Sequence, residues 1–276
     1  MTGLIFTFAL LAQAPADKPP ATPAAYLRRE YRADAEKYAF FADAERKQPL
    51  KLVEQPMMTW ANDDDWSGDV FLWTRDGMPS VVGCPLSGPG GEMNRNMYHE
   101  FHLLDSKPIA SAELQTRRTW QPAEGLKRLP MLDQKPAAAN PAGRLLQMRQ
   151  IAKSFTAHME ADGQWELRLL TQPLFRYGDE AGEVIDGTIF TWVWSKGTDP
   201  ELMMLVELRP SRRGSTWYYA PVRFSNRALW LTYEKLEVWR AESHQEPEGA
   251  TTTGNYTTAY ARFFPREAPV NEPKPE

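Results

Sequence analysis

Two histidines and a carboxylate lie within four consecutive residues, His99-Glu100-Phe101-His102. On a helix, His99 and His102 would share a face as positions i and i+3 and could bind one metal ion. The surrounding residues have instead the pattern of a strand, in which these two side chains point to opposite faces. The five-residue His-Glu-x-x-His motif of zinc peptidases is also missing. We therefore expect no metal and no other cofactor, and we keep His99, Glu100 and His102 as a candidate polar site.

Aromatic residues are the strongest excess in the composition, with ten Trp, ten Tyr and twelve Phe. Most of these rings should pack in the core. Rings exposed on a sheet would instead suit the face of a sugar, and rings lining a concave surface would suit an apolar ligand. The candidate aromatic ligand surface consists of Trp60, Trp66, Trp217 and Tyr219.

Three other motifs give weaker signals for chemistry. The acidic run at 62–65 lacks the spacing and the central glycine of a calcium-binding loop, which favours a solvated hairpin turn. The glycines at 88–91 are not followed by the Lys-Ser/Thr pair of a phosphate-binding loop. Cys84 is the only cysteine, so no internal disulfide can form, and we expect it to be buried on a strand. No pattern of a catalytic triad is found.

Composition and charge describe a folded protein of ordinary type. The 276 residues are 42% hydrophobic, which is ample for a core, and the net charge is −4. Because acids and bases are interspersed, no basic stripe is available for a phosphate backbone, and we expect no nucleic-acid partner.

The N-terminus is typical of an export signal. An apolar run at 4–11 is followed by two overlapping Ala-x-Ala sites, and cleavage after Ala16 avoids a proline next to the scissile bond. A run this short cannot cross a bilayer, which takes about 20 apolar residues. We therefore expect an exported protein, periplasmic, secreted or in the cell envelope, without a membrane span.

The chain repeats part of its own pattern. A shift of 117 positions aligns residues 28–56 with 145–173 without a gap, and with small gaps Trp73 and Trp120 meet Trp192 and Trp239. A period of about 120 residues is too long for a solenoid and indicates two copies of one small domain.

Each copy is expected to begin with an amphipathic helix, over 27–47 and 144–159, where apolar residues recur at three- and four-residue intervals. After each helix the period falls to two, and turn pairs separate about five short strands. The expected strands are 50–60, 69–74, 80–84, 97–104 and 109–120, then 165–170, 188–195, 202–209, 216–224 and 228–240. Short links without crossover helices require antiparallel sheets. The predicted fold is therefore α+β, an internal duplication packed as a pseudo-dimer, and such a fused pair should be a monomer.

The expected organisation is a signal peptide at 1–16, a linker at 17–25, the first copy at 26–121, a linker at 122–141, the second copy at 142–241 and a largely disordered tail at 242–276.

Several runs resemble a family of uncharacterised exported proteins from planctomycete-type bacteria. They include Gln147-Met-Arg-Gln-Ile-Ala152, the stretch at 165–177 and Gly197-Thr-Asp-Pro-Glu201, with Asp76-Gly-Met-Pro79 and His99-Glu100-Phe101 in the first half. The resemblance covers most of the mature chain. It implies export and a shared fold, and it assigns no activity and no catalytic residues.

These patterns favour a binding or interaction module for an unknown ligand or protein partner. The alternatives are a hydrolase or metal-dependent enzyme with a site between the copies, using His99, Glu100, His102 and Asp186 or Asp199, and a structural protein of the cell envelope. A cleft that gathers the histidines with carboxylates would favour an enzyme, and a pocket lined only by Trp and Tyr would favour binding.

Overall fold

The computed structural model describes residues 22–115, 118–131, 134–179, 182–212, 214–246 and 250–267. The expected signal peptide lies outside these residues, so export stays a prediction. Strands make up 51% and helices 11% of these described residues. In the part of the chain that is described, no helix is both long enough and apolar enough to cross a membrane.

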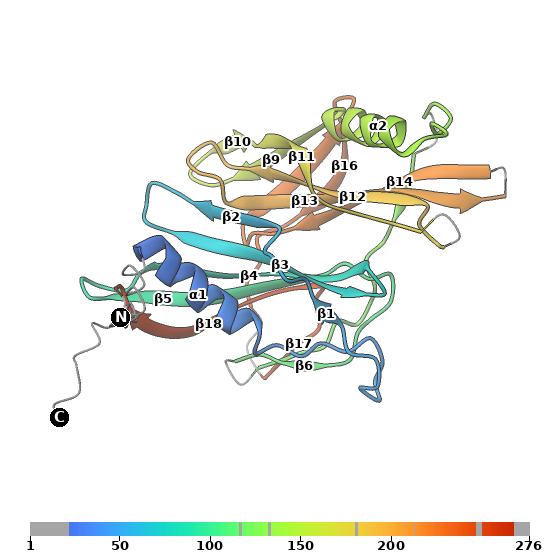
Figure 1. Ribbon diagram of the computed structural model, residues 1–276. Helices are drawn as coiled ribbons and strands as arrows, with labels where there is room; N and C mark the ends of the chain where they lie inside the picture. Colours follow the sequence, from blue (N-terminus) through green and yellow to red (C-terminus); the bar gives the residue numbers. More distant parts are fainter. Residues whose placement is uncertain are drawn as a thin grey trace, which may run out of the picture.

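The first sheet has six strands in the order β1-β3-β4-β5-β18, with β2 paired to β3 (Figure 1). These strands are β1 (Lys51–Leu52), β2 (Met58–Ala61), β3 (Ser67–Arg75), β4 (Met78–Pro89), β5 (Asn94–Leu103) and β18 (Tyr256–Pro265). The edge strand β18 comes from the segment after residue 241 that we expected to be a largely disordered tail. It runs antiparallel to β5 over ten residues.

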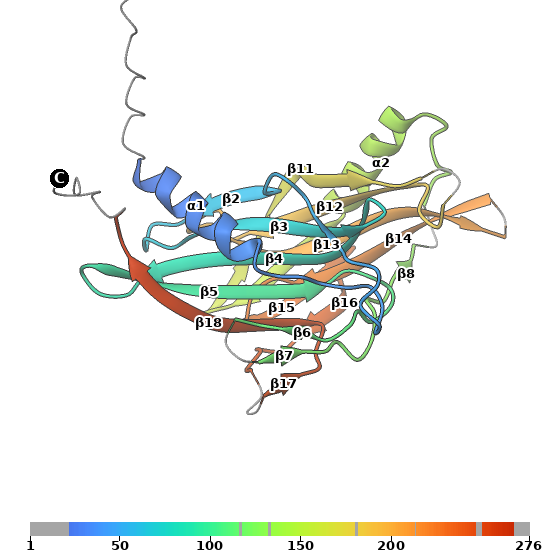
Figure 2. The same cartoon turned by 60° about the horizontal axis from the view of Figure 1, so that its bottom comes forward.

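The second sheet has the order β11-β12-β13-β14-β8. Its strands are β11 (Arg168–Tyr177), β12 (Asp186–Val193), β13 (Pro200–Ser211), β14 (Gly214–Arg223) and β8 (Leu129–Pro130), the last from the expected linker. A third sheet contains β10 (Gln164–Glu166), β9 (Phe155–Glu160), β15 (Ala228–Tyr233) and β16 (Leu236–Ala241). A small sheet of β17 (Thr251–Thr252), β7 (Thr119–Trp120) and β6 (Ala112–Glu113) lies beyond β18 (Figure 2).

Both helices begin at a capping side chain followed by proline, a common helix start. Thr22 Oγ1 accepts a hydrogen bond from the Ala25 amide before α1 (Pro23–Ala35), and Asn140 Oδ1 accepts one from the Gly143 amide before α2 (Pro141–Lys153). Helix α1 packs against β3 and β4, whereas α2 packs against β11, β12 and β13.

The molecule has three hydrophobic cores. The α1 core lies between α1 and the first sheet, the shared core lies between the first and second sheets, and the α2 core lies among α2, the second sheet and the third sheet. On β3, Phe71 and Trp73 face the α1 core, while Val70 and Leu72 face a core shared with the second sheet. The second sheet alternates in the same way, because Met203 on β13 enters the shared core and its neighbours enter the α2 core. Both sheets are therefore buried on both faces, which explains their long apolar runs.

The predicted duplicated α+β layout is wrong: the fold is mostly β, with two helices among the described residues and several antiparallel sheets. The expected helix at 27–47 ends at Ala35, and the residues after it continue as irregular chain with Tyr38 and Phe40 in the core. The expected helix at 144–159 ends at Lys153. Beyond it, Phe155, Ala157 and Met159 alternate inward as strand β9.

The two halves also differ in how their strands assemble. In the first half, β5 is completed by β18 from the C-terminal segment, whereas in the second half β15 and β16 lie outside the main sheet and β15 pairs with both β9 and β16. A helix followed by five strands of one sheet therefore describes neither half.

Candidate functional site

A cavity of about 460 Å³ opens where the first and second sheets meet, and we call it the cleft. The first sheet contributes the β2–β3 hairpin, β5 and β18, and the second contributes the residues after β12 and after β14. A volume of this size is typical of a small-molecule site. Its principal lining residues are Trp60, Asn62, Asp64, Trp66, Tyr98, Glu100, Trp194, Asp199, Glu201, Ser225, Arg227, Tyr256 and Thr258.

Trp66 is held at the mouth of the cleft by a tight turn. The Asn62 Oδ1 atom accepts hydrogen bonds from the amides of Asp64 (3.1 Å) and Trp66 (3.0 Å), and Asp65 takes a positive φ of 61°. The indole lies flat on Gly88, where an added Cβ would be 2.3 Å from two ring atoms. Only glycine at this position on β4 lets the ring approach the strand so closely.

The same turn is tied to the body of the protein by Arg95. This guanidinium, on a residue 2% exposed, donates to Asp65 Oδ1 (2.9 Å) and to the Asp65 carbonyl (2.5 Å). It also donates to the hydroxyl and carbonyl oxygens of Ser87. Charge-assisted bonds of this kind make the hairpin a rigid support for Trp66.

Four acidic residues line the cleft, Asp64, Glu100, Asp199 and Glu201, and the last three have raised pKa values. Glu100 on β5 and Glu201 on β13 are 8% and 4% exposed, and the Tyr256 hydroxyl donates to Glu100 Oε2 at 2.8 Å. Burial, reinforced by the neighbouring acids, raises the pKa of Glu100 to about 8. Burial and the charge of Asp199 raise the pKa of Glu201 to about 7, and burial also raises the pKa of Asp199. At neutral pH the Glu100 carboxyl is therefore mainly protonated and can donate a hydrogen bond.

The second-sheet wall is built around Trp194. Lys196 Nζ lies 4.7 Å and Arg227 Cζ 4.8 Å from the centroid of its ring, in cation–π geometry. Two buried polar atoms on this wall, Trp194 Nε1 and Asp199 Oδ1, have no hydrogen-bond partner within the described ranges. One donor and one acceptor are thus left for another molecule.

The loop after β14 is shaped by Arg223. Its guanidinium donates to the backbone carbonyls of Ser225 (2.9 Å), Arg227 (2.9 Å) and Glu242 (2.8 Å). The same guanidinium lies 5.1 Å from the centroid of the Tyr256 ring. Both sides of the cleft are therefore fixed by buried or half-buried arginines.

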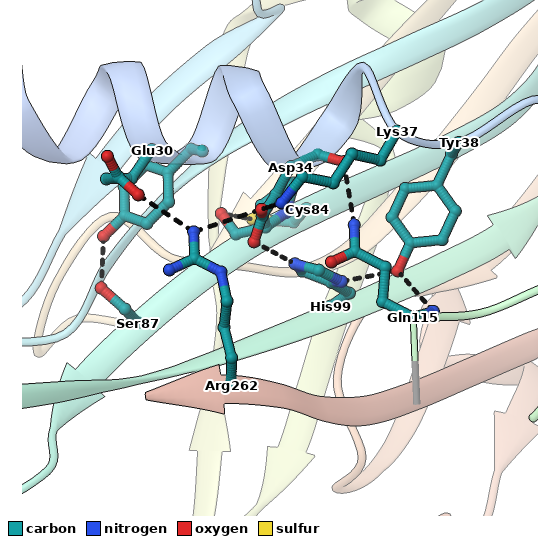
Figure 3. Close-up of polar contacts among 11 residues, drawn as sticks. Glu30, Asp34, Lys37, Tyr38, Cys84, Ser87, His99, Gln115 and Arg262 are labelled. Carbon is teal, nitrogen blue, oxygen red and sulfur yellow. Dashed lines mark hydrogen bonds and ion pairs between the residues drawn. The ribbon is translucent and has the colours of Figure 1, made fainter. Parts of the chain in front are cut away.

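The candidate polar site is divided by β5, because residues 99 and 100 face opposite sides of the sheet. His99 points towards α1, where it meets Asp34 and Tyr38 (Figure 3). There its Nε2 lies 3.0 Å from Asp34 Oδ2 and its Nδ1 lies 2.6 Å from the Tyr38 hydroxyl. A neutral ring satisfies both contacts by donating to Asp34 and accepting from Tyr38.

Asp34 is the centre of this buried network. Besides His99, it accepts from Lys37 Nζ at 2.5 Å and from Arg262 Nη2 at 3.2 Å. Burial disfavours its charge, but the hydrogen bonds from His99 and Lys37 outweigh burial and hold the pKa of Asp34 below its usual value. Asp34 is fully buried and His99 is 1% exposed, so this group ties α1 to β5 and β18 and is closed to a substrate.

His102 and Cys84 share the Glu100 face of the sheet. His102 Nδ1 donates to the Leu103 carbonyl at 2.7 Å, and burial lowers the pKa of the ring to about 4. Cys84 is fully buried, accepts from Trp60 Nε1 at 3.3 Å and has a raised pKa because of burial. A neutral histidine and a protonated thiol at these positions are packing groups. No cluster of three metal-binding side chains occurs in the described ranges.

The four candidate aromatic residues are also separated. Trp60 and Trp66 line the cleft. Trp217 is buried in the α2 core, and Tyr219 packs beside that core with its ring centroid 4.9 Å from that of Phe155. The two additional acids of the enzyme alternative separate as well. Asp199 lines the cleft, but Asp186 is bound by Arg144 and Arg176 beside α2.

Sequence reasoning missed Glu201, Arg227 and Trp194 as site residues. One signal was available for Glu201: it is a charged residue at the start of the apolar run Leu202-Met-Met-Leu-Val206, where β13 is buried on both faces. Glu100 has a similar setting between Met97 and Leu103. An ionisable residue inside such a strand requires either a partner or a function.

No family model matches this chain, and neither the curated proteins nor the solved structures include a significant match. The resemblance to exported planctomycete-type proteins therefore stays a prediction.

Proposed function

We propose that this protein is a ligand-binding module that holds a small polar organic molecule in the cleft between the first and second sheets. The observation that carries the proposal is a contrast among buried acids. Asp34, Asp186 and Glu207 are each paired with two or more basic side chains, and their pKa values are lowered.

The two most buried cleft acids have no such pairing. Burial raises the pKa values of Glu100 and Glu201, and the hydrogen bonds with the Tyr256 and Ser225 hydroxyls only partly oppose it. Among the described residues, Arg227 is the only basic residue that lines the cleft. Leaving such groups in a cavity costs stability, as do the unpartnered Trp194 and Asp199 atoms. A ligand with hydroxyl or amino groups would satisfy them, and the Trp60 and Trp66 rings would contact its apolar faces.

Binding can be tested with a panel of neutral sugars, amino acids, amines and carboxylic acids. Intrinsic tryptophan fluorescence serves as the readout, because three indoles line the cleft. In the variant Thr258→Trp the cleft is filled from β18 beside Glu100, so binding should be lost. In the matched control Thr251→Trp, an exposed residue of β17 is changed, so binding should be retained. Absence of any signal from the panel, or equal signals from both variants, would contradict the proposal.

The second candidate is a hydrolase that uses Glu100 and Glu201 as a general acid and base. The specific observation is that two buried carboxyls from different strands line one cavity with pKa values of about 8 and about 7, near the range where such catalysis is efficient. Aryl glycoside and aryl ester substrates with a coloured leaving group test this candidate. Turnover that disappears in both Glu100→Gln and Glu201→Gln, while ligand binding persists, would favour the enzyme over a binding module.

A further inference from the structure

A second cavity of about 440 Å³ lies beside the cleft, between α1 and the β2–β3 hairpin. It shares Trp60, Asn62 and Trp66 with the cleft, so the hairpin forms a common wall of both cavities. The rest of its lining comes from α1, from β2, β3 and the turn between them, and from Thr198 before β13. A ligand that extends from the cleft past this wall reaches a second cavity that is already open.

The second cavity contains an unsatisfied buried acid of its own. Asp69 is 2% exposed, and its carboxyl has a hydrogen bond with the Thr59 side chain. Its Oδ1 atom has no partner among the residues described. Arg28 also lines this cavity, but no ion pair between Arg28 and Asp69 is formed. Each of the two cavities thus presents an unpartnered carboxylate oxygen, Asp69 Oδ1 in one and Asp199 Oδ1 in the other.

We infer that the ligand is an oligosaccharide without acidic groups, which spans both cavities and crosses the wall at Trp66. This inference rests on the proposed function of the cleft. A sugar chain presents apolar C–H faces that suit indole rings and hydroxyls that suit carboxylate oxygens and indole N–H groups. Since each cavity has the volume of a small-molecule site, two or more linked rings are needed to occupy both.

The acidic residues that line the two cavities disfavour the binding of an acidic oligosaccharide. The lining of the two cavities includes the acidic residues Asp64, Asp65, Asp69, Glu100, Asp199 and Glu201, against Arg28 and Arg227. Glu100 is mainly protonated at neutral pH, so the other acids supply the negative charge. A uronic acid or a sulfated sugar would bring a further negative charge into this poorly solvated region. A neutral or amino sugar avoids that repulsion.

Chain length is the decisive variable in the test. Gluco-, manno-, xylo-, galacto- and N-acetylglucosamine oligomers of one to six units are titrated by calorimetry, with oligogalacturonides as the acidic comparison. In at least one neutral or amino-sugar series, affinity should rise tenfold or more from one unit to four, and the acidic series should not bind.

Two variants of the second cavity locate the effect. Asp69→Asn should weaken binding of the tetramer about threefold to tenfold through loss of one hydrogen bond, with the single sugar unaffected. Ala61→Trp fills the same cavity from the exposed face of β2 without altering Asp69, and it should remove the gain from chain length.

The outcomes separate this inference from the function on which it rests. If panel compounds bind in the cleft but no oligomer series gains affinity with length, the oligosaccharide inference is wrong and the binding function stands. If the length gain survives in Ala61→Trp, the second cavity plays no part in it and the inference is again wrong. If nothing binds at all, the proposed function fails as well.

Discussion

The replacement Glu100→Gln should make the protein more stable at high pH, with almost no effect at low pH. The Glu100 carboxyl has an ordinary pKa of 4.5 in the unfolded chain and a pKa of about 8 in the folded protein. Between these values the folded state keeps a proton that the unfolded state has lost, so stability of the native protein falls as pH rises through this window. Each pH unit costs about 1.4 kcal/mol, so the full effect is on the order of 5 kcal/mol. Glutamine cannot ionise, so the Glu100→Gln variant does not lose this stability as pH rises.

Urea unfolding of both proteins at pH 4.5, 6, 7 and 8.5 measures the effect. The difference in free energy of unfolding between Glu100→Gln and the native chain should widen steadily with pH. Glu92→Gln, in the exposed turn between β4 and β5, is the matched control and should show no such trend. A difference between Glu100→Gln and the native chain that stays within about 1 kcal/mol across the whole range would show that water reaches Glu100, and it would refute the reasoning.

Three further predictions concern the supports of the fold and the cleft. Asp34→Asn leaves basic groups unpaired in the α1 core and should cost about 3–5 kcal/mol in urea unfolding, whereas Glu36→Gln, exposed on the same helix end, should be nearly neutral. Gly88→Ala places a methyl group into the Trp66 ring and should shift tryptophan emission and cost about 1–3 kcal/mol. Cys84 should resist a thiol reagent in the native protein and react only on unfolding in urea, because it is fully buried; fast labelling without denaturant would contradict the packing of that strand.

The individual strands could largely be predicted from the sequence, because burial on both faces leaves long apolar runs between turn residues. The helix ends could not be placed in the same way. Phe155 and Met159 are four residues apart, which fits a helix, yet with Ala157 they also fit a strand, and the pairing of β9 with β15 decides between the two. Tyr38 similarly continues the helical spacing of α1 but packs from irregular chain against Phe101.

The self-similarity of the sequence corresponds to local pairings and not to a shared layout. Leu52 pairs with Trp73 on the first sheet, and Leu169 pairs with Trp192 on the second. The partners that complete each sheet come from distant segments, namely β18 for the first and β8 for the second. Pairings between segments so far apart leave no periodic pattern in the sequence. The predicted duplication therefore covered more of the chain than the structure supports.

The cleft could be predicted only in part for the same reason. Alternation along the strand was enough to predict that His99 and His102 lie on opposite faces, and the aromatic excess pointed to Trp60 and Trp66. The separation of His99 from Glu100 was not predicted. Glu201 reaches the cleft from the other sheet, and no pattern within a single strand indicates which residues of two facing sheets will meet.

The distribution of arginines links the stability of this fold to its proposed use. Arg223 lies near Glu100 and Arg95 binds the turn that carries Trp66, yet both bind backbone carbonyls and neither forms an ion pair with Glu100 or Glu201. They therefore fix the shape of the cavity without neutralising its carboxyls. A chain selected for stability alone would pair those acids, as it does for Asp186, or replace them with apolar residues. A preformed binding site requires rigid walls around unpaired acids, because binding then costs little further conformational entropy of the protein.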